Sequence, residues 1–243
     1  MRARKHWIVL SRNIKIYDAC AESQIKINKD KEGKAFVGSA ILIPLNFAGN
    51  EKIEEFVEGV LKHISPQYSP YFIELVKTME AKDFDRSLSV TDTINFEIYG
   101  NDTSRYAQLS KISLLDHTIR VVKNTVEVTV EERIPQYLKD LCILAGLLHD
   151  FGKNHNIRDQ YQRDKSDRHD QISANFAERT IKDFYKRSEH LSFELNKKLI
   201  DSLVLTLYEH HSKAPSVPKG VLRETLIKAD FMAREQEIVM LGA

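Results

Sequence analysis

Apolar residues recur at helical spacing along the sequence, and the longest apolar run leads directly to a polar pair, His149 and Asp150. Gly152 and Lys153 follow this pair, as is typical of a helix C-terminus. The leucines of the run have the spacing of one buried helix face, namely Leu141, Leu144, Leu147 and Leu148. The pattern therefore predicts that the polar pair lies where a buried helix leaves the core.

The same spacing predicts a succession of helices from residue 109 to the end of the sequence. Pro135 suits the first turn of the second helix, and Pro215 and Pro218 separate the last two. The expected helices are Leu109–Val126, Pro135–Asp150, His169–Lys186, Phe193–His211 and Leu222 onward. We therefore expect a helical bundle in this part of the chain. The last helical pattern continues to the final residues, as it would in a fragment of a longer protein.

The N-terminal part has a more mixed pattern. Apolar runs predict strands at Trp7–Leu10 and Ala35–Leu45, and alternation over residues 88–99 predicts a strand or an extended linker. Helical spacing predicts one helix over Lys52–Ile64, ended by the Ser-Pro step that follows it. A second helix is expected over residues 70–81.

These patterns together predict a mainly α protein with two parts. The expected division is an N-terminal α+β region over residues 1–103, whose role the sequence does not indicate, and a helical domain over residues 104–243. Hydrophobic residues make up 42% of the chain and charged residues 29%, as in ordinary globular proteins. The formal charge of +1 gives no overall attraction to nucleic acid or to membranes.

The apolar runs and the cysteines bear on the compartment. The longest apolar run is far shorter than the roughly 20 residues that a transmembrane helix needs. The W-I-V-L run after the basic N-terminus is too short for a signal peptide. Cys20 and Cys142 form no Cys-x-x-Cys motif, which fits a reducing compartment and excludes a metal site built from several thiolates. We expect a cytoplasmic protein that does not act at a membrane.

Imidazole and carboxylate groups recur near the ends or inward faces of the predicted helices. Together they suit divalent transition metals such as iron, manganese, zinc, nickel or cobalt. They exceed what one tetrahedral ion needs, so two ions about 3.5–4 Å apart, bridged by Asp150, are a natural arrangement. The candidate metal ligands are His117, His149, Asp150, His169, His210, His211 and Asp230.

Each candidate ligand also has a structural interpretation when it is taken alone. His149 could be a hydrogen-bonded histidine at a helix end, and His117 a hydrogen-bonded core histidine. Asp230 could be an ion-paired helix carboxylate. His169 begins a second His-Asp pair, where Asp170 could simply interact with the helix dipole. The order and number of the candidates favour a metal site over these separate explanations.

The order H…HD…D, formed by His117, His149 with Asp150, and Asp230, resembles the HD superfamily of metal-dependent phosphohydrolases. The local sequence L-L-H-D-F-G-K is similar to that family's H-D-x-G-K form. The resemblance covers residues from about 105 to 235 and implies an HD-type helical bundle. It implies that these four residues hold one metal ion. It also implies that His169 and His210 hold a second ion, as in dinuclear members, with Asp150 bridging.

Substrate contacts are expected in the polar segment that follows the HD pair. By the resemblance, Lys153 would contact phosphate or assist the nucleophilic water. Arg158 and Arg168 are predicted to face the metals and neutralise a substrate phosphate. The alternative is that this charged segment is a solvated loop.

The leading functional hypothesis is a divalent-metal phosphohydrolase that acts on a nucleotide or a nucleic-acid phosphoester, with Asp150 and Lys153 as catalytic residues. The chain after His210 and His211 lacks the Gly-Tyr-Pro signature of related cyclic-dinucleotide phosphodiesterases, which argues against that activity. The short path from the double histidine to Asp230 resembles HD-type relaxases of conjugative elements. A DNA-processing module is therefore one alternative, and a non-catalytic nucleotide-binding domain is another.

Overall fold

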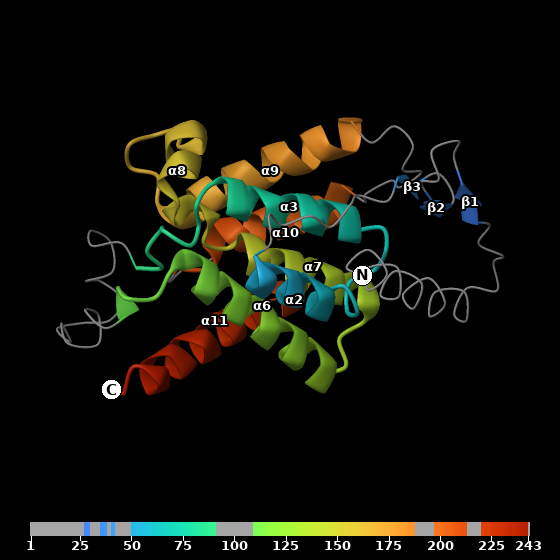
Figure 1. Ribbon diagram of the computed structural model, residues 1–243. Helices are drawn as coiled ribbons and strands as arrows, with labels where there is room; N and C mark the ends of the chain where they lie inside the picture. Colours follow the sequence, from blue (N-terminus) through green and yellow to red (C-terminus); the bar gives the residue numbers. More distant parts are fainter. Residues whose placement is uncertain are drawn as a thin grey trace.

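The computed structural model is mainly α-helical, as predicted, and its described residues are 27–29, 35–37, 40–41, 50–90, 109–187, 197–212 and 220–242 (Figure 1). The helices are α2 (Glu51–Val60), α3 (Ser69–Ala81), α6 (Leu114–Glu131), α7 (Gln136–Leu148), α8 (His155–Tyr161), α9 (His169–Arg187), α10 (Lys197–Glu209) and α11 (Val221–Met240), with a short 3-10 helix η1 (Phe151–Lys153) after α7. Every helix in these ranges is too short or too polar to cross a membrane.

Three short strands form a small antiparallel sheet in the N-terminal region, in the order β1 (Ile27–Lys29), β2 (Ala35–Val37) and β3 (Ala40–Ile41). The single strand predicted over residues 35–45 is therefore two short strands, β2 and β3. The strand predicted at Trp7–Leu10 lies outside the described residues, as does nearly all of the segment 88–99.

Helix α7 lies at the centre of the helical bundle, where it packs against α6, α9, α10 and α11. Residues 140–148 are all buried, which explains why this segment is apolar on every side and not only along one stripe. Gly146 lets α6 approach closely, because a Cβ there would lie 2.8 Å from Thr125 Oγ1. His149 and Asp150 leave the end of this buried helix, as the sequence predicted.

Helix α6 begins at Leu114, later than the predicted start at Leu109. Ser113 caps the helix, since its side chain accepts a hydrogen bond of 3.0 Å from the backbone N–H of Asp116. The helix also continues beyond its predicted end and stops at Glu131. The predicted start was wrong because apolar spacing alone does not locate the capping residue.

Helix α8 lies inside the segment for which a solvated loop was the alternative prediction. The side chain of Asn154 accepts a hydrogen bond of 3.2 Å from the backbone N–H of Ile157 and so starts this helix. Ile157 is fully buried and fixes α8 to the core. One apolar residue in a short helix produces no periodicity, which is why the sequence did not indicate it.

Helices α2 and α3 belong to the same hydrophobic core as the helices that follow residue 109. The rings of Tyr71 and Phe184 have centroids 5.3 Å apart, and those of Phe84 and Phe151 are 4.8 Å apart. These contacts cross the predicted division between residues 103 and 104, which stays a prediction. They support the proposal that the helical unit begins near residue 50.

Candidate metal centre

The seven candidate ligands come together where α6, α7, α9, α10 and α11 meet. His117, His149 and Asp150 form one group, and Asp150 with His169, His210 and His211 forms another. Within each group the ligand atoms all lie within 4.8 Å of one another. Asp230 joins the first group, because its Oδ1 atom lies 3.2 Å from His117 Nε2. Metal binding by the seven residues stays a prediction, but their convergence is a feature of the fold.

Three of the histidines are oriented by a hydrogen bond at Nδ1. The partners are the Glu237 carboxylate for His117 at 2.9 Å, the Gly146 carbonyl for His149 at 2.8 Å, and the Leu207 carbonyl for His210 at 2.7 Å. A neutral histidine that donates from Nδ1 to a carbonyl or a carboxylate presents an unprotonated Nε2. That tautomer is the one in which Nε2 can bind a metal ion.

Asp150 lies between the two ligand groups, with one oxygen toward each. Its Oδ2 atom is 3.4 Å from His117 Nε2 and 3.3 Å from His149 Nε2. The same oxygen accepts a hydrogen bond of 2.7 Å from Lys153 Nζ. Its Oδ1 atom is 3.5 Å from His169 Nε2. This arrangement is the one that a bridging carboxylate needs.

Several ligand atoms at the centre are buried without a hydrogen-bond partner among the described residues. They are Asp150 Oδ1, Asp230 Oδ1, both ring nitrogens of His169, and His210 Nε2. An unsatisfied buried polar atom costs about 1–3 kcal/mol, and more when it is charged. Divalent cations would satisfy the carboxylate oxygens, His210 Nε2 and one ring nitrogen of His169, and imidazole with carboxylate is a suitable donor set for them. The residues present therefore fit the metal site that the sequence predicted.

The histidines of the second group are held neutral by their surroundings. Burial, together with the charge of a neighbouring histidine, lowers the pKa of His210 to about 4 and that of His211 to about 3. Burial and the nearby Lys153 ammonium hold the pKa of His169 well below its usual range. Neutral imidazole is the form that binds metals.

Three carboxylates surround His117 in the first group. Burial and Arg234 lower the pKa of His117, but hydrogen bonds with Asp150, Asp230 and Glu237 outweigh them and raise it to about 9. Burial alone would raise the pKa of each of the two aspartates. The positive charges beside them, with the hydrogen bond from His117, instead hold both well below the usual range. A divalent cation that binds here would displace the proton that His117 holds among these carboxylates.

The three residues predicted to contact substrate have different surroundings. Lys153 is buried at the centre and donates to Asp150. Arg168 forms an ion pair with the buried carboxylate of Asp170. Arg158 has a buried Nε atom with no hydrogen-bond partner in the described part of the chain. The roles of Arg158 and Arg168 in binding phosphate stay predictions.

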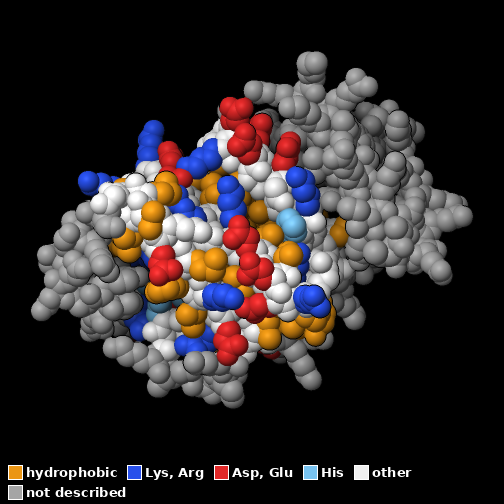
Figure 2. All heavy atoms as spheres, turned by 90° about the horizontal axis from the view of Figure 1, so that it is seen from below, with side chains coloured by type: hydrophobic (Ala, Val, Ile, Leu, Met, Phe, Trp, Pro, Cys, Tyr) orange, Lys and Arg blue, Asp and Glu red, His pale blue; other side chains and the backbone are white. Residues whose placement is uncertain are grey.

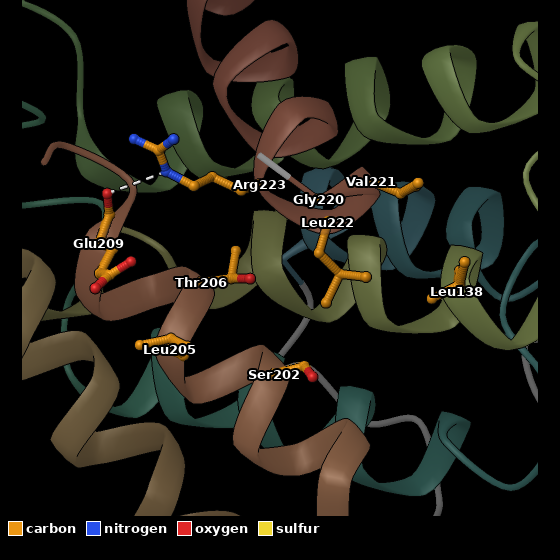
Figure 3. Close-up of a pocket in the computed structure, with 9 residues that line it drawn as sticks. All are labelled: Leu138, Ser202, Leu205, Thr206, Glu209, Gly220, Val221, Leu222 and Arg223. Atoms are coloured by element: carbon orange, nitrogen blue, oxygen red, sulfur yellow. Dashed lines mark hydrogen bonds between the residues drawn. The ribbon is translucent and has the colours of Figure 1, made fainter. Parts of the chain in front are cut away.

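The end of α10, where His210 and His211 lie, is fastened to the start of α11. Arg223 donates from Nε to the carbonyl of Glu209 at 3.3 Å (Figure 3). It also donates from Nη2 to the carbonyl of Ser212 at 2.9 Å. A pocket of about 270 Å³ lies beside this contact, between α7, α10 and α11. None of the seven candidate ligands lines it, so the pocket is separate from the metal centre.

Three residues that contact the candidate ligands or Lys153 were not predicted. Arg234 and Glu237 are on the same face of α11 as Asp230, four and seven positions later. That spacing is a signal that could have found them. The third is Ser89, whose backbone carbonyl accepts a hydrogen bond from Lys153. A backbone carbonyl has no signature in the sequence, so this contact could not have been predicted.

Comparison with known proteins agrees with this geometry. The sequence profile of the HD domain matches residues 114–238, which is more than half of the 243 residues. The matched region runs from the first turn of α6 almost to the end of α11 and contains all seven candidate ligands. No curated protein and no solved structure matches the chain significantly. The chain belongs to the HD superfamily of metal-dependent phosphohydrolases.

Proposed function

We propose that this HD-domain protein uses two divalent metal ions to hydrolyse a phosphoester of a nucleotide or a nucleic acid. The observation that carries the proposal is the position of Asp150, which has one oxygen beside each group of ligands. One ion would be held by His117, His149, Asp150 and Asp230. The second would be held by Asp150, His169, His210 and His211.

The chain's own residues prepare this site for phosphoryl chemistry. Bound divalent ions would supply an activated water molecule and would polarise a phosphoryl oxygen. Asp150 would bridge the ions, and hydrogen bonds at Nδ1 keep three of the histidines aimed at them. Lys153 places a buried positive charge beside Asp150, where it would stabilise the negative charge that develops on a phosphoryl group.

Metal content is the first test of the proposal. We expect about two divalent ions per chain in the wild-type protein by inductively coupled plasma mass spectrometry, after purification without chelators. H169A and H210A should retain about one ion, whereas a variant of an exposed histidine, H155A, should retain two. A wild-type protein that binds no divalent ion would contradict the proposal.

Substrate class is the second test. Nucleoside mono-, di- and triphosphates and short oligonucleotides are incubated with the protein and with Mn²⁺, Fe²⁺, Zn²⁺, Ni²⁺ or Co²⁺. R158A and R168A are expected to raise KM for the preferred substrate several-fold with little change in kcat, because they remove charges that contact phosphate. Unchanged KM in both variants would remove these arginines from the proposal.

The two alternatives predict different results with nucleic acid. A DNA-processing module should bind oligonucleotides with an affinity that falls steeply as salt rises. Acidic and basic side chains are interspersed on the face of the described residues seen in Figure 2, which is unlike an extended basic footprint. A non-catalytic nucleotide-binding domain should bind nucleotides without turnover under every metal condition.

A further inference from the structure

Ser89 lies outside the residues that match the HD domain, yet it is fully buried beside the metal centre. Its backbone carbonyl accepts a hydrogen bond of 2.9 Å from Lys153 Nζ and another of 3.1 Å from Arg234 Nη2. Its hydroxyl oxygen accepts a third, also of 3.1 Å, from Arg234 Nη1. One residue therefore binds two cationic side chains that come from distant parts of the sequence.

The position of Ser89 is fixed by the segment that leads into α6. Its backbone N–H donates to the carbonyl of Ile112 at 3.1 Å, and its neighbour Leu88 forms a β-bridge with Ser113. The backbone N–H of Leu114 donates to the carbonyl of Ser87 at 2.7 Å. Because α6 carries His117, these contacts fix the position of the Ser89 carbonyl relative to a candidate metal ligand.

Arg234 extends these contacts to both sides of the first ligand group. Its Nη1 atom also donates to Glu237 Oε2 at 2.9 Å, and the other oxygen of that carboxylate bonds to His117 Nδ1. Its Nη2 atom lies 3.9 Å from Asp150 Oδ2. The two terminal nitrogens of one rigid guanidinium thus contact the residues that orient Lys153 and His117.

We infer that Ser89 and Arg234 form a positioning clamp that holds the Lys153 ammonium against Asp150. Lys153 has three N–H donors, and the clamp and Asp150 engage two of them among the described residues. The third N–H is then directed by these two contacts and, if the proposed function holds, is the one that a phosphate oxygen accepts. Arg234 is thus a positioning residue, because it acts through Lys153 and Glu237.

The clamp needs arginine specifically, which makes it testable by a conservative change. A guanidinium can reach Ser89 and Glu237 with two nitrogens in a fixed plane, whereas a lysine ammonium is a single point charge. R234K keeps the positive charge but cannot make both contacts. We therefore expect R234Q to change kcat and Mn²⁺ affinity, and we expect R234K not to return either quantity to its wild-type value.

A double-mutant cycle between Arg234 and Lys153 tests the inference. Mn²⁺ affinity is measured by isothermal titration calorimetry of the metal-free proteins, and kcat and KM are measured with bis(p-nitrophenyl) phosphate. We expect R234K to lower kcat about 10–100-fold with little change in KM. In the R234K/K153M double variant, kcat should fall by a factor that is at least about tenfold smaller than the product of the two single-variant factors. The changes in Mn²⁺ affinity should be non-additive in the same direction. Single effects that multiply to within about twofold in both measurements would overturn the inference.

Two further variants keep the test decisive. S89A removes one contact with Arg234 and keeps the carbonyl; it should show the same non-additivity with K153M at a smaller amplitude, even if R234K does not fold. R179K changes an exposed arginine of α9 and should leave kcat and Mn²⁺ affinity unchanged.

A wild-type protein that binds Mn²⁺ but hydrolyses no phosphoester would contradict the proposed function alone, since the calorimetric cycle would still decide the clamp. A wild-type protein that binds no Mn²⁺ would overturn both.

Discussion

Gly152 occupies a place in the HD segment where no side chain fits. A Cβ at this position would lie 2.1 Å from the carbonyl oxygen of His169 and 2.9 Å from the Cβ of Ile172. Its backbone N–H donates to Ser173 Oγ at 2.8 Å, so η1 is held directly against the start of α9. The close approach brings Asp150 within 3.5 Å of His169. The glycine is therefore a condition for bringing the two ligand groups together.

The variant G152A should weaken both the fold and the metal centre. We expect the free energy of unfolding to fall by about 1–3 kcal/mol, because the added methyl group forces η1 away from α9. The metal content should fall as well, because Asp150 moves away from His169. Urea unfolding and metal analysis measure the two effects.

The control is G59A in α2, where a Cβ meets nothing within 4 Å and alanine should stabilise the helix by about 0.5–1 kcal/mol. Unchanged stability and metal content in G152A would show that the close approach is not required.

Cys142 is a second residue whose chemistry is set by its surroundings. Burial in α7 raises the pKa of its thiol from 9.0 to about 11. At pH 8 the folded protein should therefore contain very little thiolate, and a C20S variant should react with 5,5′-dithiobis(2-nitrobenzoate) only after unfolding in urea. Because the folded state retains this proton to a higher pH, the thiol's contribution to stability should be lost as pH rises from about 9 to about 11. Rapid labelling of the folded C20S protein at pH 8 would contradict this.

At the scale of elements, α7 organises the molecule from both of its ends. Its C-terminal end delivers the HD pair, and Asp140 near its N-terminal end holds the connection between α2 and α3. The Asp140 carboxylate is fully buried and accepts hydrogen bonds from Ser65 N at 2.8 Å, from Ser65 Oγ at 2.5 Å and from Gln136 Nε2 at 2.8 Å. One helix thus connects the N-terminal helices to the metal centre.

The variant D140A should lower the free energy of unfolding by about 2–4 kcal/mol, because it leaves the buried groups of Ser65 without an acceptor. Metal content should remain at the wild-type value, since Asp140 is about 13 Å along α7 from His149. Urea unfolding and metal analysis measure these two quantities. D201A removes an exposed carboxylate from α10 and should change stability by less than about 0.5 kcal/mol. Loss of metal in folded D140A would indicate a coupling along α7 that these contacts do not explain.

At the scale of the whole molecule, the residues before the HD domain complete both its core and the candidate metal centre. Aromatic side chains from α3 and from the segment after it pack against η1 and α9. Ser89 contributes a carbonyl to Lys153. An HD domain separated from these residues would expose apolar surface that is now buried, and it would lose one contact of a proposed catalytic residue.

This packing predicts the behaviour of two truncated chains. A chain of residues 104–243 should unfold without cooperativity, bind 1-anilinonaphthalene-8-sulfonate and self-associate, because the surfaces covered by α2 and α3 become exposed. A chain of residues 46–243 should unfold cooperatively and retain the wild-type metal content. Circular dichroism and size-exclusion chromatography distinguish these outcomes. A stable, monomeric, metal-binding chain of residues 104–243 would instead support a domain boundary at residue 103.

The sequence by itself determined the class of fold and the set of candidate ligands. Helical periodicity is a local property, and it predicted α7, α9 and α11 closely. The H…HD…D order is a property of residue types in sequence, and it indicated the HD family before any contact was known. Helix boundaries were less well predicted, because capping residues such as Ser113 decide where a helix begins.

The tertiary structure decided which groups meet at the centre. The two oxygens of Asp150 face different ligand groups only because α9 and α10 pack against the end of α7. Glu237 orients His117 because α11 lies along α6, and Ser89 holds Lys153 through a backbone carbonyl that every residue type possesses. The physical reason is the same in each case. Periodicity and motif order report on neighbours along the chain, whereas these contacts depend on the packing of segments up to 120 positions apart.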